Sequence, residues 1–203
     1  MLIWLVLIPL IAAALIGLCK APARPTALLS ATLTLALGIW ALVSFDGCSS
    51  CWSRFEGMDL QLTLAPALSK VMLLLTILVT FATVLGTNPP QGGEASWYNS
   101  ALLISAGATG AFLSDNIISF FAFHELALIP TFVMIGLYGR GDRRTTAWRA
   151  TLYLGLASMV LLAALLMIGT QAGFTFSGLK DFMASGRELA HAELIGALLI
   201  AGF

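Results

Sequence analysis

The sequence predicts an all-α protein: a polytopic integral membrane helix bundle with about six full transmembrane helices and the start of a seventh. Hydrophobic residues make up 59% of the 203 residues, and charged residues make up only 10%. A soluble protein of this composition would expose far more apolar surface than monomers tolerate. The apolar runs also lack the polar and apolar alternation of outer-membrane strands, so they predict helices.

Six apolar runs are long enough for a spanning helix, which needs about 20 residues to cross a hydrocarbon core of roughly 30 Å. A seventh run begins near Ala192 and reaches Phe203. The first run is interpreted as a retained helix and not a signal peptide, because its basic residues Lys20 and Arg24 follow the apolar stretch. In chain order, the six predicted helices are Leu2–Leu18, Thr26–Phe45, Ala67–Gly86, Tyr98–Ser114, Ile117–Tyr138 and Ala150–Gly169.

The basic residues predict an orientation in the membrane. Arg140, Arg143, Arg144 and Arg149 lie between the fifth and sixth predicted helices. Basic residues in short loops favour the cytoplasmic side, so we expect this loop in the cytoplasm and the amino terminus outside. The arginines also suit contact with anionic lipid headgroups, an interpretation that we prefer to a specific partner site.

The loop after the second helix, which this orientation places outside, contains Cys48 and Cys51. In an oxidising compartment this spacing permits a local disulfide, and two idle thiols are an equal alternative. Two cysteines do not complete a four-ligand zinc site. Neither alternative implies electron transfer.

Glu125 is the most informative residue, because it lies near the middle of the fifth apolar run. An ionised side chain at that depth costs about 2.5–3.5 kcal/mol on insertion scales, so such acids usually face a polar pathway or a partner. Desolvation favours the neutral acid and a nearby cation favours the carboxylate, so its charge depends on its neighbours. We prefer a proton-path role to simple pairing with a structural cation.

Three further residues could support Glu125. His124 precedes it, but successive helix positions point about 100° apart, so we expect the imidazole to pack elsewhere and not to relay protons. Pro130 removes a backbone hydrogen bond and predicts a bend whose freed carbonyls need protein or water beside them. Asp115 is expected to cap the fifth helix, with proton entry as the second interpretation.

The fourth predicted helix is rich in small residues, including Gly107 and Gly110. Small residues let neighbouring backbones approach closely in membranes. We therefore interpret this stretch as a packing surface.

Several motifs together resemble a known family. Phe120–Pro130 reads Phe-Phe-Ala-Phe-His-Glu-Leu-Ala-Leu-Ile-Pro and is followed by Gly136–Gly139, Gly-Leu-Tyr-Gly. This stretch resembles the fifth helix of the antiporter-like subunits of respiratory complex I, most of all chain M of bacteria and subunit 4 of mitochondria. Gly110–Phe121 resembles the family's Gly-x-Phe-x-x-Asp run, and Leu152–Ser158 suits its sixth helix.

The resemblance implies a proton-translocating membrane subunit of an NADH–quinone oxidoreductase in the inner (cytoplasmic) membrane. It implies that Glu125 modulates the proton affinity of a lysine in the seventh helix. It also implies that this chain binds no cofactor and no metal, since NADH, FMN, iron–sulfur clusters and quinone belong to partner subunits. Residues 1–97 would form helices one to three, and residues 98–203 an incomplete first antiporter-like repeat with helices four to six and the start of the seventh.

Two departures from the family leave alternatives open. The third helix begins Ala65-Pro66-Ala67 where the family usually has Asp-Gly, and the family's lysine and Pro-His-x-Trp-Leu-Pro run would follow Phe203. We expect a partial subunit, completed by a second chain or belonging to a longer one, that contacts other complex I membrane subunits and lipid but no nucleic acid. The alternatives are a fragment with a packing role only, or a subunit of a multi-subunit sodium/proton antiporter or membrane hydrogenase.

Overall fold

The structure is a computed structural model. It describes every residue except 1, 45–48, 56–57, 65–66, 90–91 and 203, and within residues 49–61 it describes the backbone alone. The elements are α1 (Leu2–Gly17), α2 (Ala23–Ser44), β1 (Ser49–Phe55), β2 (Met58–Thr63), α3 (Ala67–Gly86), α4 (Glu94–Leu113), α5 (Ile117–Tyr138), α6 (Arg143–Ala172), α7 (Phe176–Ala184) and α8 (Ala192–Gly202).

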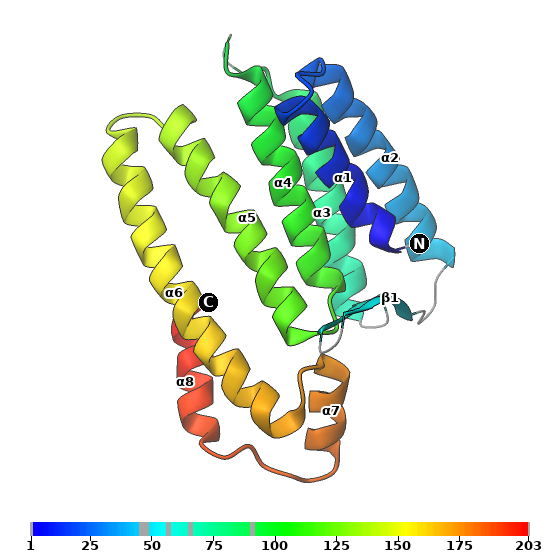
Figure 1. Ribbon diagram of the computed structural model, residues 1–203, viewed down its shortest axis with the longest axis vertical. Helices are drawn as coiled ribbons and strands as arrows, with labels where there is room; N and C mark the ends of the chain where they lie inside the picture. The colour runs from blue at the N-terminus through cyan, green and yellow to red at the C-terminus, as the bar shows by residue number, and fades with distance from the viewer. Residues whose placement is uncertain (1, 45–48, 56–57, 65–66, 90–91, 203) are drawn as a thin grey trace.

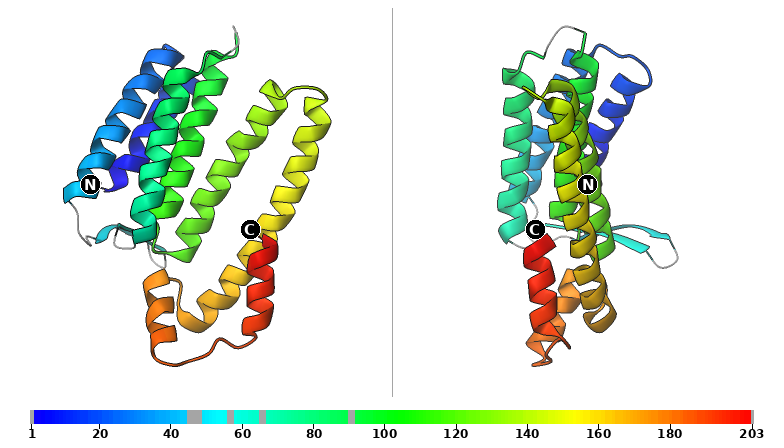
Figure 2. Two further views of the ribbon diagram at one scale, coloured as in Figure 1. Left: turned by 180° about the vertical axis from the view of Figure 1, so that it is seen from behind. Right: turned by 90° about the vertical axis from the view of Figure 1, so that its left-hand side faces the viewer.

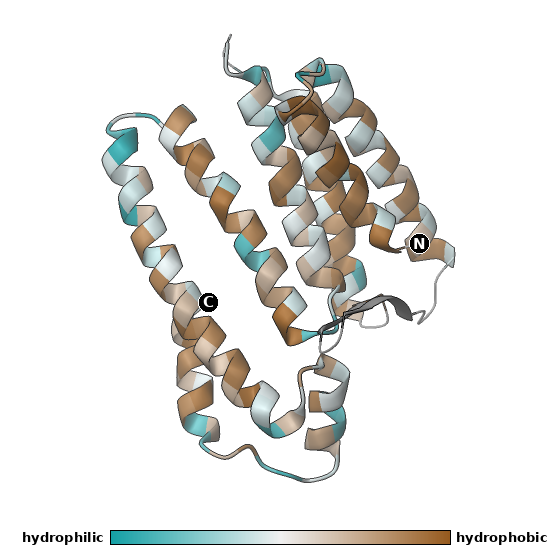
Figure 3. Ribbon diagram, in the orientation of Figure 1, coloured by the Kyte–Doolittle hydropathy of each residue, from teal (hydrophilic) through white to brown (hydrophobic). Residues whose placement is uncertain are grey.

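A helix forms at each predicted apolar run, and the protein is a helical, multi-pass membrane protein. Among the described residues, four helices (α2, α3, α5 and α6) have the length and hydropathy of a membrane span, whereas α1 and α8 are shorter apolar helices. α4 has 20 residues, but its polar and small residues lower its hydropathy. Helix length and hydropathy therefore do not establish six full spans plus a seventh. Apolar residues run along the helices, and hydrophilic residues gather near the helix ends and loops (Figure 3).

Three helices begin earlier than the apolar runs indicated, and the first of them is α2, which begins at Ala23 and not at Thr26. α4 begins at Glu94, and α6 begins at Arg143 because the side chain of Asp142 accepts a hydrogen bond from the Thr145 backbone N–H. Arg143 and Arg144 therefore lie in the first turn of α6, and Arg149 also lies in α6, so of the four arginines expected in the loop only Arg140 precedes the helix. At 1.5 Å per residue, the 30 residues of α6 exceed the roughly 30 Å of a hydrocarbon core.

Helices α1 to α4 form one group, with α5 beside α4 and α6 beside α5 (Figure 1). α4 contacts α1, α2, α3 and α5, so it forms the centre of the bundle. Two apolar clusters fill this group. One joins the ends of α1, α2 and α3 to Leu62, Leu64 and Leu113. The other surrounds the fully buried ring of Tyr98 near the opposite end.

The carboxy-terminal elements pack on α6. α8 runs back along α6, and the two helices approach so closely that a Cβ at Gly202 would lie 2.7 Å from the backbone nitrogen of Leu161. A third apolar cluster fills the space between α5, α6 and α8 with Ile117, Leu165 and Ile195 among its buried members. α6, α7 and α8 extend beyond the hairpin end of α1–α4 (Figure 1).

Two elements were not predicted from the sequence: the short helix α7 and an antiparallel hairpin. β1 and β2 pair with Ser49 opposite Thr63 and Phe55 opposite Met58, and the register shifts between Cys51 and Arg54. The hairpin points away from the helices (Figure 2). The predicted disulfide concerns Cys48 and the side chain of Cys51, which lie outside the described part of the structure.

Candidate functional site

The start of α5 is capped by Asn116 and not by Asp115 as we expected. The side-chain oxygen of Asn116 accepts hydrogen bonds from the backbone N–H groups of Ile118 and Ser119, at 2.8 and 3.3 Å. Both Asn and Asp are favoured at this position, and the sequence offered one directly after the other. The last extended residue before the helix is Asn116, so its side chain, not that of Asp115, meets the free N–H groups.

Asp115 instead fixes the start of α7. Its carboxylate accepts from the Ser177 backbone N–H at 3.1 Å and from the Ser177 hydroxyl at 2.7 Å. The backbone reinforces this contact, because the Phe176 N–H donates to the Asp115 carbonyl and the Ile117 N–H donates to the Phe174 carbonyl. Asp115 therefore joins the start of α5 to the start of α7.

Small residues of α4 pack closely against α5, although the sequence predicted only a packing surface and not which helix it meets. A Cβ on Gly107 would lie 2.8 Å from both the Phe123 carbonyl oxygen and the Ala127 nitrogen. A Cβ on Gly110 would overlap the Phe123 ring at 2.4 Å. Because these two positions have no side chains, the backbones of α4 and α5 touch. The contact is made at Phe123, two residues before Glu125.

Glu125 lies in the first half of α5 beside His124. Nδ1 of His124 is 3.9 Å from Oε1 of Glu125, and the two side chains are 28% and 32% exposed. Glu125 is therefore only partly buried within this chain, less than we expected. Its Oε1 atom is nevertheless buried and has no hydrogen-bond partner among the described residues.

The contact between His124 and Glu125 differs from the expectation of side chains on separate faces. Successive Cα–Cβ directions do diverge by about 100° on a helix. The side chains are long enough to turn back toward one another, however, and the imidazole lies near the rings of Phe120 and Phe121, at centroid distances of 6.3 and 6.4 Å.

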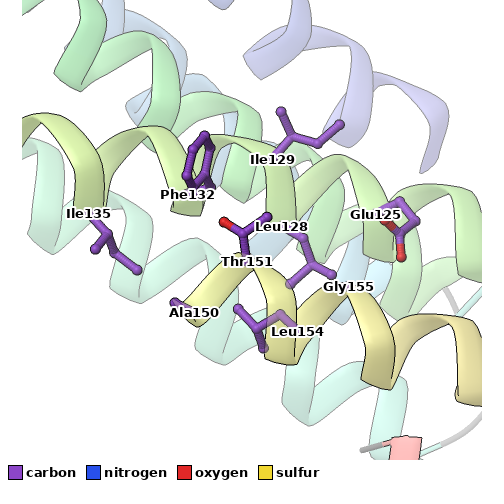
Figure 4. A pocket seen from close by; sticks show the side chains of 9 residues that line it. All are labelled: Glu125, Leu128, Ile129, Phe132, Ile135, Ala150, Thr151, Leu154 and Gly155. Carbon is purple, nitrogen blue, oxygen red and sulfur yellow. The ribbon is translucent and has the colours of Figure 1, made fainter. Parts of the chain in front are cut away.

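Glu125 also lines a cleft of about 150 Å³ between α5 and α6 (Figure 4). Apart from this carboxylate, the polar side chain of the lining is Thr151, whose hydroxyl donates to the Ala147 carbonyl at 2.9 Å. Gly155 leaves space on the α6 side, since nothing lies within 4 Å of a Cβ built there. The remaining lining residues are apolar: Leu128, Ile129, Phe132, Ile135, Ala150 and Leu154.

Thr151 and Gly155 were not predicted from the sequence as residues of the site. Their spacing of four residues was the available signal, because it places a hydroxyl and a glycine on one face of α6. The sequence of one helix does not indicate which other helix packs against that face. That Thr151 and Gly155 line the same cleft as Glu125 therefore became visible only with the fold.

Pro130 is buried within α5, and the helix continues through it. Proline has no N–H for the Leu126 carbonyl four residues earlier. The next residue, Thr131, donates its hydroxyl to the Ala127 carbonyl at 2.8 Å. A hydroxyl contact of this kind is one way in which membrane helices satisfy backbone groups near a proline. The bend at Pro130 stays a prediction.

The four predicted site residues are thus divided between two places. Glu125 and His124 are in contact, Pro130 lies further along the same helix, and Asp115 lies at the α7 end. Within the described residues there is no group of three or more His, Cys, Asp or Glu side chains that could hold a metal ion.

Comparison with known proteins gives one family and several relatives. Residues 114–203 match the family described as NADH:quinone oxidoreductase/Mrp antiporter, transmembrane region. NADH-quinone oxidoreductase subunit M of Pseudomonas aeruginosa is 30% identical over 188 residues, which cover 80% of this chain and 37% of that protein. The chain thus spans little more than a third of that relative, and the resemblance to subunit M stated from the sequence is confirmed.

Solved structures agree with this result. A chain of respiratory complex I from Thermus thermophilus with bound NADH superimposes with a TM-score of 0.82 at 25% identity, over 99% of this chain and 43% of that chain. A chain of the Mrp complex from Dietzia sp. DQ12-45-1b gives a TM-score of 0.79 at 20% identity, over 99% of this chain and 23% of that chain. The second likeness concerns the fold alone.

Proposed function

We propose that this chain contributes Glu125 to a proton path of a membrane-bound NADH–quinone oxidoreductase, because residues 114–203 match the transmembrane region of the NADH:quinone oxidoreductase/Mrp antiporter family. Its place there would be that of subunit M, the type of relative with which it shares 30% identity. The membrane would be the inner, cytoplasmic membrane. Residues 98–203 would belong to the first antiporter-like repeat.

One observation carries this proposal: Oε1 of Glu125 is buried beside an apolar cleft and has no hydrogen-bond partner among the described residues. A buried carboxylate oxygen without a hydrogen bond is costly in such a place, and it would be stabilised by a proton or by a cation. A single group that alternates between these two partners performs one step of proton transfer. His124, 3.9 Å away, would tune that alternation.

The second partner of Glu125 would be a lysine supplied by the assembled subunit. A carboxylate within about 4–6 Å of an ammonium favours its charged form. Neutralising the carboxylate or moving it away would then release the lysine proton. NADH, FMN, iron–sulfur clusters and quinone would act in partner subunits, and this chain would contact the other membrane subunits, including any second chain that completes it.

The experiment is Glu125→Gln in the membrane assembly that contains this chain. Glutamine keeps the shape but not the titratable group, so NADH-driven acidification of inside-out vesicles should fall strongly while subunit content stays equal. Glu125→Asp should be milder because it keeps the charge. Glu188→Gln, in an exposed loop, is the matched control and should change nothing.

If Glu125→Gln vesicles acidify at the wild-type rate with equal subunit content, the carboxylate is structural and the packing-only alternative is correct. The second candidate function is a subunit of a multi-subunit sodium/proton antiporter, because the matched family includes Mrp antiporters. Vesicles that exchange sodium for protons without NADH would favour this candidate. If the chain belonged to a membrane hydrogenase, the formation or oxidation of molecular hydrogen, and not NADH, would drive the acidification of the vesicles.

A further inference from the structure

The cleft between α5 and α6 has the arginine-rich turn at one of its ends. Its lining runs from Glu125 to Ile135, which lie at opposite ends of the cleft (Figure 4). Ile135 lies in the last turn of α5, next to the turn that carries Arg140. α6 begins directly after this turn with Arg143 and Arg144. Basic groups and an apolar cleft therefore meet at this end of the two helices.

Arg144 lies on the face of α6 that lines the cleft. Successive residues of an α-helix are about 100° apart, so the residues four, seven and eleven positions after Arg144 share its face. These residues are Trp148, Thr151 and Gly155, and the last two line the cleft. By the same spacing Arg149 lies on the opposite face of α6. Arg144 is thus the arginine of this face.

Trp148 lies between Arg144 and the cleft, and its side chain is 56% exposed. Its ring packs edge-on against Phe132 of the cleft lining, with the ring centroids 6.3 Å apart. Tryptophan side chains gather where the hydrocarbon of a bilayer meets the headgroups. Arg144, one turn nearer the start of α6, therefore lies at headgroup level, and the cleft lies in the hydrocarbon.

The guanidinium of Arg144 is available to a ligand. Its side chain is exposed and makes no hydrogen bond or ion pair within the described part of the chain. The neighbouring Arg143 already donates to the Leu137 carbonyl at 2.8 Å, and the Asp142 carboxylate already accepts a backbone hydrogen bond. Residues 140–144 contain three arginines and one aspartate, so their net charge of +2 attracts an anion.

The length of this face of α6 matches the depth of one leaflet. Eleven residues separate Arg144 from Gly155, which at 1.5 Å per residue corresponds to about 16 Å. Half of a hydrocarbon core of roughly 30 Å is about 15 Å. A fatty-acyl chain whose phosphate contacts Arg144 would therefore run along the apolar lining and end near Gly155.

We infer that this surface binds one phosphatidylglycerol molecule, with its phosphate on Arg144 and one acyl chain in the cleft between α5 and α6. An arginine can donate two parallel N–H groups to phosphate oxygens, and the apolar lining suits a hydrocarbon chain. A zwitterionic lipid carries a second, positive group that the arginine-rich turn repels. The inference goes beyond the proposed function and does not rest on it, because the phosphate is held about one leaflet's depth from Glu125.

The test is photo-crosslinking of the membrane assembly that contains this chain, in phosphatidylcholine vesicles with a small admixture of a lipid that carries a diazirine in one acyl chain. A phosphatidylglycerol probe is compared with a phosphatidylcholine probe that has the same chains. Peptide mass spectrometry should find about fivefold more adducts on residues 150–155 with phosphatidylglycerol, the effect expected of one basic residue near an anionic group. Equal yields would overturn the inference.

Two arginine variants separate a specific site from a general surface charge. Arg144→Gln should lower the phosphatidylglycerol yield to that of phosphatidylcholine, and Arg144→Lys should retain most of the preference because it keeps the charge. Arg149→Gln is the matched control, since it removes the same charge near the same helix end but on the opposite face, and it should keep the preference. Equal losses in Arg144→Gln and Arg149→Gln would mean that the surface potential of the whole end attracts the lipid, and the site assignment would be wrong.

Gly155→Leu tests the position of the acyl chain. Nothing lies within 4 Å of a Cβ at Gly155, so a leucine side chain can extend into the cleft without displacing its neighbours. The phosphatidylglycerol adducts on Thr151 and Leu154 should then fall at equal subunit content. Unchanged adducts would place the chain outside the cleft and contradict the inference.

A protein segment is the other possible occupant of the cleft. If a helix of the assembled subunit fills it, neither probe will label residues 150–155, and the lipid assignment is wrong. The readout is lipid labelling and not acidification of vesicles, so this result would leave the proposed role of Glu125 unchanged.

Discussion

The side chain of Asn116 holds the first turn of α5 through two backbone N–H groups. Asn116→Ala removes this acceptor and should lower the free energy of unfolding by about 1 kcal/mol. Asn116→Asp keeps an acceptor and should be close to wild type. Unfolding in mixed micelles with increasing dodecyl sulfate measures both variants, and equal stability of Asn116→Ala and wild type would contradict the capping role.

Asp142 gives the turn before α6 a dependence on pH. Hydrogen bonds from the Thr145 side chain and backbone hold the pKa of the Asp142 carboxyl below its ordinary value of 3.8. A lowered pKa means that the native state favours the carboxylate. Its contribution to stability is therefore complete above the ordinary pKa and is lost as the pH falls through the lowered one.

Asp142→Ala tests this dependence. At neutral pH the variant should unfold at a lower temperature than wild type, and in acid, below 3.8, the two melting temperatures should converge. Asp142→Asn can still accept the Thr145 hydrogen bond but does not titrate. The melting temperature of this variant should therefore also approach that of wild type in acid, from a smaller difference at neutral pH. A difference between wild type and Asp142→Ala that is independent of pH would contradict the assignment.

Single residues were predicted unevenly from the sequence. Glu125 was recognisable because an acid inside an apolar run is rare. The prediction of Asp115 as the cap was wrong, because Asp and Asn both suit that position. The residue at which the backbone turns helical decides between them, and the sequence does not specify it. The contact of His124 with Glu125 depends on side-chain rotamers, which the spacing along a helix does not specify.

At the level of helices, the contact between α4 and α5 rests on Gly107. A Cβ added at Gly107 would lie 2.8 Å from backbone atoms of α5. Backbone atoms cannot move aside as a flexible side chain can. Gly107→Ala should therefore destabilise the bundle by about 1–3 kcal/mol through overpacking. The measurement is again unfolding in mixed micelles.

Gly196→Ala is the matched control for Gly107→Ala. It also replaces a helical glycine, in α8, but nothing lies within 4 Å of the new Cβ. Helix propensity alone should then stabilise it by up to about 1 kcal/mol. Similar effects of the two substitutions would show that helix propensity, and not contact between α4 and α5, determines the result at Gly107.

Long apolar helices were predicted well and short elements were not. Every run of about 17 or more apolar residues forms a helix, because hydrophobicity and length suffice in a bilayer. α7 has nine residues, and the hydrogen bonds at its start come both from its own cap, Thr175, and from Asp115, which lies 62 residues before Ser177 in the chain. The Thr175 cap is a local signal, but the contact with Asp115 is not recognisable from the residues around α7.

Across the whole molecule, charge is distributed unevenly between the two ends of the helices. The turns after α1, α3 and α5 lie at one end, and the hairpin and α7 lie at the other (Figure 1). Basic residues outnumber acidic ones at the first end, where the acids are Glu94 and Asp142. The basic residues there are Lys20, Arg24, Arg140, Arg143, Arg144 and Arg149.

This asymmetry predicts that the end with the α5–α6 turn faces the cytoplasm, since basic residues close to helix ends favour that side. Thr145 is exposed at this end, and Ser185 is exposed beyond α7 at the other. In a background with Cys19, Cys48 and Cys51 replaced by serine, Thr145→Cys should resist a membrane-impermeant maleimide in intact cells and react after lysis. Ser185→Cys should react in intact cells. The reverse pattern would invert the orientation, and it would place the arginine-rich end of the bundle, with Lys20 and Glu94, outside the cell.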